Sequence, residues 1–432
     1  MATKRDLNIN VHHLTRVEGH GNIVVDVKNG ELKKAELEIV ESPRFFESLL
    51  RGRPWEEAPY ITARICGICA VGHAQASINA LEDALGVVPS EQTIKLRKLL
   101  FNAETMQSHW LHAFFLAAPD FFGAGSALEL VGDKPEVVKM ALRLKRLAND
   151  LGDMIAGRKV HPITMKVNGF TTLPSREDMQ DIRKRLVEAR EDMETTMNLL
   201  QGVAIPDFER ATEYVALHLE DEYAWIDGGI RTTDGFDYDV HDYRAVTNEK
   251  VVPHSSAKHC SHNRDSYMVG ALARFNVNHE LLRPEARDVA RELGLEAPCT
   301  NPFMNTVAQV VEGVHCLEDS IELLDEFLAE GLQREPREVE FRPGSGIGAA
   351  EVPRGVLFHE YEIDETGHIS RANCIIPTGQ NLANIDADLR SLVPQVIDRP
   401  KAEITLALEM LVRAYDPCIS CSTHLLNVEF ED

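Results

Sequence analysis

Apolar residues recur along most of the chain at the three- and four-residue spacing of amphipathic helices. Such stripes predict long helices over residues 73–85, about 90–118, 135–157, 175–202, 304–330 and 401–415. Stop signals follow three of the stripes, at Gly86, Pro119 and Gly202, and Ser175 with Asp178 resembles a capping box. Helices with one core-facing side therefore make up most of the expected structure.

Strand patterns are confined to shorter parts of the chain. Residues 22–40 predict a β-hairpin, because apolar residues alternate from Ile23 to Val27 and Asn29-Gly30 supplies a turn. Two other segments lack helical periodicity, are rich in Pro, Gly, Asp and His, and indicate loops with short strands: residues 203–260 and 335–380.

Length and composition indicate one integrated unit. The chain has 432 residues, of which 44% are hydrophobic and 26% charged, a balance typical of a globular protein with a sizeable core. The sequence contains no internal repeat and no clear linker. We therefore expect one mainly α-helical domain of the α+β class over residues 1–432. It would be a long-helix bundle with peripheral β structure, and residues 1–60 would form its β-containing N-terminal segment.

The net charge narrows the range of partners. Lys and Arg number 45 against 69 Asp and Glu, a net charge of −24, which argues against nucleic acid and anionic membrane as partners. No apolar run approaches the roughly 20 residues of a membrane span. The N-terminus, MATKRDLNIN, has basic residues without a following apolar segment and does not resemble a secretion signal. We expect a cytoplasmic protein.

Four of the eight cysteines form two C-x-x-C pairs, Cys66 with Cys69 and Cys418 with Cys421. Two intervening residues let both sulfurs of a pair turn toward one ion, and four thiolates can surround a soft metal. In a chain this long without a secretion signal, such pairs indicate a metal or redox site rather than disulfides. Spacing alone leaves a structural zinc site open, although the two pairs lie near opposite ends of the chain.

The residues around the cysteines form a more specific signature. The first pair lies in R-I-C-G-I-C-x-x-x-H, which ends at His73, and the second in D-P-C-x-x-C-x-x-H, which begins at Asp416. This combination resembles the signature of nickel–iron hydrogenase large subunits. Further matching stretches are R-V-E-G-H from Arg16, S-P-R-F-F-E from Ser42, P-R-G from Pro353 and C-I-I-P-T from Cys374. The related quinone-side subunit of complex I shares the fold but lacks the four cysteines.

The resemblance implies a nickel–iron centre and an enzyme that oxidises H2 or reduces protons. Cys66 and Cys418 would be terminal thiolates on nickel, and Cys69 and Cys421 would bridge nickel to iron. The iron would carry one carbon monoxide and two cyanides, giving a Ni-Fe(CN)2(CO) centre. Thiolates are soft donors, which suits such a metal pair.

The same resemblance assigns roles to residues that handle charge around the centre. Glu18 would relay protons, although as an isolated residue it could simply pair with Arg16. Arg354 would place its guanidinium over the open metal position, and Asp416 would hold Arg354. Many membrane-associated members have a further aspartate here, and the corresponding position in this chain is approximately Ser108.

Two more residues are expected to hydrogen-bond the centre. Thr378 would donate to a cyanide, and His73 would contact a bridging sulfur. Taken alone, a histidine at a helix start more often satisfies nearby backbone groups, so the role of His73 depends on the motif.

A second metal is implied by three further positions. Glu47, the backbone carbonyl of Cys374 and the side chain of His424 would bind Mg²⁺, with water completing an octahedron. In some relatives iron occupies this position, and the histidine is compatible with Fe²⁺.

The resemblance also implies protein partners. The remaining cysteines form no iron–sulfur pattern, so electrons would leave through an iron–sulfur small subunit. The sequence resembles the soluble cytoplasmic branch (NAD(P)-linked, bidirectional or bifurcating), whose electrons pass to flavin- or NAD(P)-binding diaphorase-type subunits. Residues 425–432 are a candidate removable extension for a maturation endopeptidase. A hydrogen-sensing homologue and a structural zinc protein remain alternatives.

Overall fold

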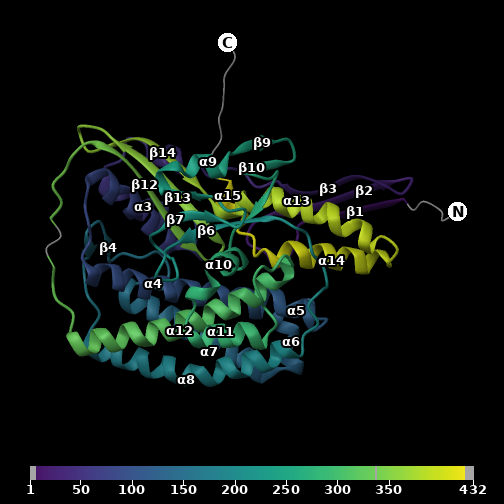
Figure 1. Cartoon of the computed structure of the whole chain (residues 1–432), viewed down its shortest axis with the longest axis horizontal. Coiled ribbons are helices and arrows are strands. Elements are labelled where there is room, and N and C mark those ends of the chain that lie inside the picture. Colours follow the sequence, from purple (N-terminus) through teal and green to yellow (C-terminus); the bar gives the residue numbers. More distant parts are fainter. Residues whose placement is uncertain (1–5, 336–337, 424–432) are drawn as a thin grey trace, which may run out of the picture.

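The computed structural model describes residues 6–335 and 338–423, and a layer of long helices forms its base (Figure 1). This layer contains α4 (Glu91–Trp110), α6 (Ala127–Asp133), α7 (Pro135–Ala156), α8 (Arg176–Gln201), α11 (Pro284–Glu292) and α12 (Asn305–Glu330). The long members coincide with four of the predicted stripes. The mainly α-helical class is therefore confirmed.

The end of α4 differs from the prediction. The helix continues through a π-helical turn, Leu111–Ala117, into α5 (Ala118–Phe121), so Pro119 does not end it. Pro119 lies directly after this π-helical turn, where the regular α-helical hydrogen-bond ladder is already interrupted. The predicted cap of α8 is confirmed, since the side chain of Ser175 accepts a hydrogen bond from the backbone N–H of Asp178.

Four sheets contain the described strands. The first has the order β1-β2-β3-β10-β9 and includes the predicted hairpin, whose strands β2 and β3 pair antiparallel. The others have the orders β11-β6-β7-β8, β12-β13-β14 and β4-β5. The strands are β1 (Leu7–Val11), β2 (Gly21–Lys28), β3 (Glu31–Ile39), β4 (Met165–Lys166), β5 (Gly169–Phe170), β6 (Glu213–His218), β7 (Gly229–Thr232), β8 (Asp237–Tyr238), β9 (Lys250–Val252), β10 (Ser255–His259), β11 (Tyr267–Met268), β12 (Gly344–Val352), β13 (Gly355–Ile363) and β14 (Ile369–Ile375).

The prediction of loops with short strands is wrong for residues 335–380. This region holds the antiparallel sheet β12-β13-β14, two of whose strands have nine residues each. Almost every residue of β13 is buried, so both of its faces are covered. A strand buried on both faces lacks the polar–apolar alternation that sequence reading depends on.

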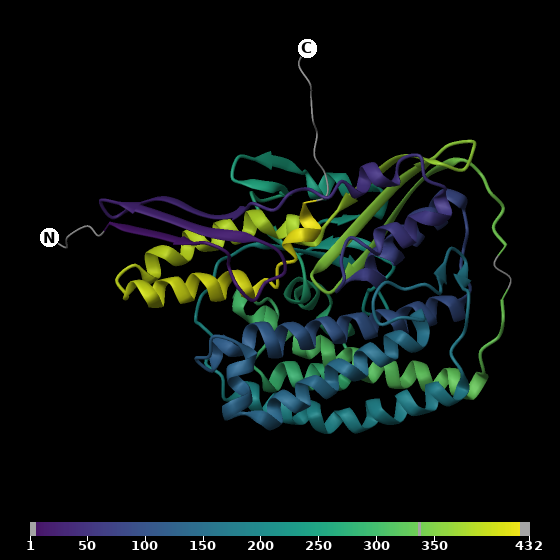
Figure 2. The same cartoon turned by 180° about the vertical axis from the view of Figure 1, so that it is seen from behind.

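The remaining helices place the two cysteine pairs. The first pair immediately precedes α3 (Ala70–Leu85), and the second follows α14 (Lys401–Ala414) and overlaps the short α15 (Ile419–Ser422). Seen from behind, α13 lies against the N-terminal strands and α14 lies beside α13 (Figure 2). The helices not yet given are α1 (Phe46–Leu50), α2 (Ala58–Thr62), α9 (Tyr243–Thr247), α10 (Ala271–Asn278) and α13 (Pro377–Val396).

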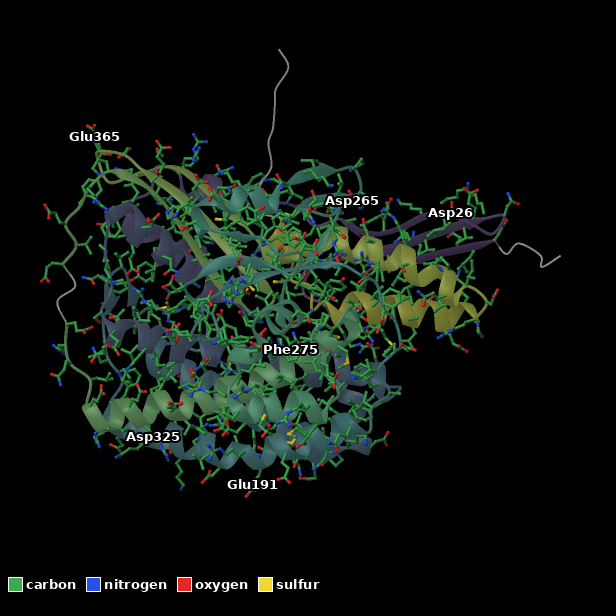
Figure 3. All side chains as sticks on the ribbon, viewed as in Figure 1. Asp26, Glu191, Asp265, Phe275, Asp325 and Glu365 are labelled. Carbon is green, nitrogen blue, oxygen red and sulfur yellow. The ribbon has the colours of Figure 1, made fainter. Side chains whose placement is uncertain are left out.

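Figure 3 adds the side chains and labels residues in the middle of the molecule and at its edges. Phe275 is buried near the middle of the molecule, whereas Glu191, Asp325 and Glu365 are exposed at its edges. Within residues 6–335 and 338–423, no helix is long and apolar enough to cross a membrane. The boundaries of a single domain over residues 1–432 stay a prediction.

Candidate metal centre

The fold brings the two cysteine pairs together in its interior. The Sγ atoms of Cys66 and Cys418 lie 3.5 Å apart, and one ligand atom from each of the four cysteines lies within 4.8 Å of the others. All four side chains are buried and none is in a disulfide. Four soft donors converging on one point suit a thiophilic transition metal, such as zinc, iron or nickel.

Backbone contacts between distant segments hold this arrangement. Glu18 and Cys418 form an isolated parallel bridge, in which the N–H of Ile419 donates to the carbonyl of Glu18 at 2.9 Å. The guanidinium of Arg44 donates to the carbonyl oxygens of Ile65 and Ser420, at 2.7 and 2.6 Å. Arg44 thereby joins the loop before the first pair to the turn of the second. The sequence showed the stretch around Arg44 only as part of the family resemblance and gave no indication of this role for Arg44.

The four thiols interact strongly with one another. Hydrogen bonds with Cys418, Cys421 and Cys69 hold the pKa of the Cys66 thiol well below its ordinary value. Hydrogen bonds with Cys421 and then Cys66 raise the pKa of Cys418 well above its ordinary value. These shifts favour a state in which Cys66 is a thiolate and its neighbours keep their protons. A soft metal cation would replace those protons and stabilise the other thiols as thiolates too.

Arg354 lies where the resemblance predicts, beside Asp416. Its Nε donates to the backbone carbonyl of Asp416 at 2.6 Å, and its Nη2 donates to Oδ1 of that residue at 2.7 Å. Its Nη1 lies 3.3 Å from the hydroxyl oxygen of Ser108. Both members of the ion pair are almost fully buried. The ion pair between Arg354 and Asp416 that the resemblance implies is present, and the hydroxyl of Ser108 also contacts the guanidinium.

The backbone before Arg354 is held by a second buried arginine that sequence reading did not single out. Arg274 donates to the carbonyl oxygens of Val352 and Pro353, at 2.9 and 3.0 Å. Its charge is balanced by Glu312, which accepts two hydrogen bonds of 2.7 Å. This network fixes the turn from which Arg354 projects. No motif marks Arg274 in the sequence.

Thr378 and His73 lie near the cysteines, and each has a polar contact with another residue. The hydroxyl oxygen of Thr378 accepts a hydrogen bond from the N–H of Cys418 at 2.9 Å, which leaves the hydroxyl proton available for donation. Nδ1 of the buried His73 lies 3.4 Å from Nε2 of His359. Their roles toward a cyanide and a bridging sulfur stay predictions.

The predicted second-metal residues are partly brought together. The carboxylate of Glu47 is buried and accepts a hydrogen bond from the N–H of Cys374 at 2.9 Å, so the two lie side by side. The carbonyl of Thr423 accepts from the N–H of Arg44 at 2.8 Å, which brings the second motif close to the segment of Glu47. His424 and the predicted removable segment 425–432 lie outside the described residues.

Glu18 contacts one sulfur of the cysteine cluster, that of Cys418. The thiol of Cys418 donates to Oε2 of Glu18 at 3.2 Å, and the N–H of Ser420 donates to the same oxygen at 3.0 Å. The side chain is half-buried, between the buried cysteine and the solvent. The alternative pairing with Arg16 is not the contact observed, because Arg16 pairs with Asp120.

Glu104 is another buried carboxylate close to the cysteines that sequence reading missed. Its two oxygens accept the N–H groups of Val71 and Gly72, at 2.6 and 2.8 Å, in the first turn of α3. Burial raises the pKa of Glu104 to about 8. It caps the helix that begins directly after Cys69. Its position inside a helical stripe gave no signal of this role.

Comparisons with known proteins match this site across the chain. The family described as Nickel-dependent hydrogenase matches residues 44–140 and 257–424, and a family described as HoxL-like matches residues 8–42. The alpha subunit of sulfhydrogenase 1 from Pyrococcus furiosus is 34% identical over 98% of this chain and 99% of its own length. Sulfhydrogenase 2 subunit alpha from the same organism is 35% identical, over 97% of this chain and all of its own length.

Solved structures agree with the sequence matches. A crystal structure of an NAD+-reducing NiFe-hydrogenase in the H2-reduced state has a TM-score of 0.87 and 28% identity to this chain. The match covers 97% of this chain and 99% of that one. The two alternatives, a hydrogen sensor and a structural zinc protein, are not favoured by these matches. With its four converging cysteines, the chain belongs to the nickel-dependent hydrogenase family, as a catalytic large subunit that acts on H2.

Proposed function

We propose that Glu18 carries protons between the sulfur of Cys418 and the solvent during H2 oxidation and proton reduction. The observation behind this proposal is the 3.2 Å contact from Sγ of Cys418 to Oε2 of Glu18. When bound, the Ni-Fe(CN)2(CO) centre supplies the redox chemistry at which H2 is split or formed. The chain must then move a proton that would otherwise stay beside a buried thiolate.

The proposed proton path runs from the buried sulfur of Cys418 to the carboxylate of the half-buried Glu18. Cys418 is buried, so a proton on its sulfur needs an internal acceptor, and Oε2 of Glu18 lies within hydrogen-bond distance. The neighbouring carboxylate, Glu41, accepts from the hydroxyl of Ser420 at 2.6 Å and is not part of this path, whereas the half-buried Glu18 can itself exchange a proton with solvent. Glu18 therefore stands between the thiol and the surface.

Arg354 is proposed to stabilise negative charge at the open side of the centre. A guanidinium stays protonated at any working pH, and here two hydrogen bonds to Asp416 fix its direction. A preorganised cation in a buried site polarises a bound molecule more strongly than one in water. Thr378 and His73 are proposed to hydrogen-bond a cyanide and a bridging sulfur.

A second metal, Mg²⁺ or Fe²⁺, is proposed beside Glu47. The Glu47 carboxylate and the backbone of Cys374 already face each other, and oxygen donors suit a hard cation. His424 would supply the third protein ligand. This ion would tie the second cysteine motif to α1 and β14.

Partners are proposed from the resemblance and the relatives. The proteins that match are subunits of hydrogenases, and one solved relative is NAD+-reducing. We propose an iron–sulfur small subunit as the electron exit, diaphorase-type subunits that reduce NAD(P), and a maturation endopeptidase that removes residues 425–432 after metal loading. The cytoplasmic location stays a prediction from the sequence.

The test of the relay compares Glu18→Gln with Glu41→Gln in the purified, metal-loaded complex. Glutamine keeps the size of residue 18 but cannot take up the proton, so H2-dependent dye reduction and exchange of H2 with D2O should fall about 10²–10⁴-fold. Glu18→Asp should recover part of the exchange. Nickel and iron contents and the infrared bands of carbon monoxide and cyanide should not change.

Two outcomes would contradict the relay. Wild-type exchange in Glu18→Gln would show that the proton leaves by another route. Loss of nickel or of the diatomic bands would assign Glu18 a structural role in holding the second motif. Glu41→Gln, which leaves the contact between Cys418 and Glu18 in place, should retain most of the exchange.

A further inference from the structure

A second group of metal-ligating side chains lies outside the cysteine centre. His254 occupies the turn between β9 and β10, His259 ends β10, and Asp386 lies on α13. One ligand atom from each lies within 4.8 Å of the other two. The two histidine rings are perpendicular, with their centroids 5.2 Å apart. None of the three belongs to the residues discussed for nickel, iron or magnesium.

His259 offers a ring nitrogen that no group in the described part of the chain uses. Its Nε2 is buried and lacks a hydrogen-bond partner among the residues that the structure describes, and the residue is only 4% exposed. Burial lowers the pKa of His259 to about 4, so the ring is neutral at neutral pH. Buried polar atoms are nearly always paired, and a neutral imidazole is a common metal ligand.

Asp386 and His254 are already oriented by other contacts. Oδ1 of Asp386 accepts the N–H of Leu37 at 2.8 Å, while Oδ2 lies 2.9 Å from Nε2 of His254. On the opposite side of the same ring, Nδ1 lies 3.6 Å from a carboxylate oxygen of Glu36. A histidine between a metal and a carboxylate is the usual second-shell arrangement at metal sites, because the carboxylate fixes the ring.

We propose that His254, His259 and Asp386 bind one divalent transition-metal ion of the zinc class, with solvent as a fourth ligand. Two imidazole nitrogens and one carboxylate oxygen suit Zn²⁺ and its neighbours, whereas Mg²⁺ and Ca²⁺ prefer oxygen alone. Ligand atoms around tetrahedral zinc are about 3.3 Å apart, from bonds of about 2.0–2.1 Å. The His254–Asp386 contact of 2.9 Å needs to open only slightly to admit an ion.

The ion would connect the β9–β10 hairpin to α13. That helix begins at Pro377 and carries Thr378 in its first turn. The same turn packs on β10, since a Cβ added at Gly379 would lie 3.3 Å from the carbonyl of Lys258. A metal between His259 and Asp386 would therefore restrain the helix that positions Thr378 beside Cys418.

The experiment uses the nickel- and iron-loaded complex, so that the cysteines are already occupied. After exposure to a mild chelator, the complex is titrated with Co²⁺ and separately with Zn²⁺. We expect one additional ion per large subunit, and a cobalt spectrum typical of nitrogen and oxygen ligands without sulfur charge-transfer bands. Added Zn²⁺ should also raise the thermal midpoint of the wild-type complex.

Variants decide whether these residues are the ligands. His259→Gln and His254→Gln should each weaken Co²⁺ binding at least about 100-fold, and Glu36→Gln about 10-fold, as second-shell changes do. His241→Asn removes an exposed histidine elsewhere and should bind like the wild type. His254 is partly exposed, so its variant remains informative if His259→Gln fails to fold.

Any of three results would overturn the proposal. The wild-type complex would bind no extra Co²⁺ or Zn²⁺, or it would bind only with a sulfur spectrum. Alternatively, His254→Gln and His259→Gln would bind Co²⁺ as tightly as His241→Asn does. The outcome is independent of the Glu18 test, because H2 exchange and metal counting report on different sites.

Discussion

Gly348→Ala tests how the first cysteine pair is positioned. Gly348 is buried on β12, and α3 crosses it so closely that an added Cβ would lie 2.3 Å from both the carbonyl of Ala76 and the N–H nitrogen of Ala80. The neighbour Gly346 meets the next turn of α3 in the same way. Ordinary contacts of a Cβ begin near 3.4 Å, so α3 must move away by about 1 Å.

The size of the effect follows from that displacement. Overpacking of this kind costs about 1–3 kcal/mol. With an unfolding entropy of about 2.1 cal/mol/K per residue, a chain of 432 residues loses only about 1 °C of thermal midpoint per kcal/mol. The more sensitive readout is activity. Cys69 directly precedes α3, and a shift of about 1 Å in a reacting group can cost about 100-fold in rate.

The assay measures the thermal midpoint, the nickel content and H2-dependent dye reduction per nickel. Gly132→Ala is the matched control: Gly132 lies in the exposed helix α6 with nothing within 4 Å of an added Cβ. It should be neutral or stabilising by up to about 1 kcal/mol. If Gly348→Ala matched Gly132→Ala in midpoint and in rate per nickel, close packing of α3 on β12 would not position the centre.

Three further changes test the surroundings of the centre. Burial lowers the pKa of Lys145 to about 8. Between pH 8 and its ordinary pKa near 10.4, the unfolded chain therefore binds more protons, and the free energy of unfolding rises with pH. Lys145→Met should flatten that rise in denaturant titrations at several pH values. Arg274→Met leaves Glu312 without its cation and should cost about 3–5 kcal/mol in a thermal melt, partly recovered by adding Glu312→Gln. Arg44→Ala removes the two hydrogen bonds by which Arg44 joins the cysteine motifs and should lower nickel content per chain, measured by elemental analysis.

The helices and the four cysteines could be predicted because their signals are local. A stripe repeats within one helix, and a C-x-x-C turn is contained in four residues. The start of α3 was placed three residues late, at His73 instead of Ala70, because Ala70-Val-Gly lacks a strong apolar periodicity. The sequence therefore predicted the four cysteines that the fold brings together and most of the helices beside them.

The sheet over α3 and the supporting arginines could not be predicted, because their roles depend on contacts between distant segments. Gly346 and Gly348 alternate on β12, but glycines alone indicate a loop as readily as a strand against a helix. Arg274 joins a buried hydrogen-bond network with Glu312 and Glu351 only when the folded chain brings α10, α12 and β12 together. A charged residue in a helical stripe otherwise indicates a solvent-facing side.

The contacts that gather the four thiols are contacts within the protein itself. Glu18, Arg44 and Thr378 come from three separate segments, and each hydrogen-bonds the second cysteine motif. In a zinc ribbon, by contrast, metal binding supplies the free energy of folding. Here a large buried core and the Arg354–Asp416 pair position the sulfurs through packing and hydrogen bonds. The protein scaffold therefore orients the second cysteine motif through contacts from several separate segments, which is the kind of support that a preorganised catalytic site needs.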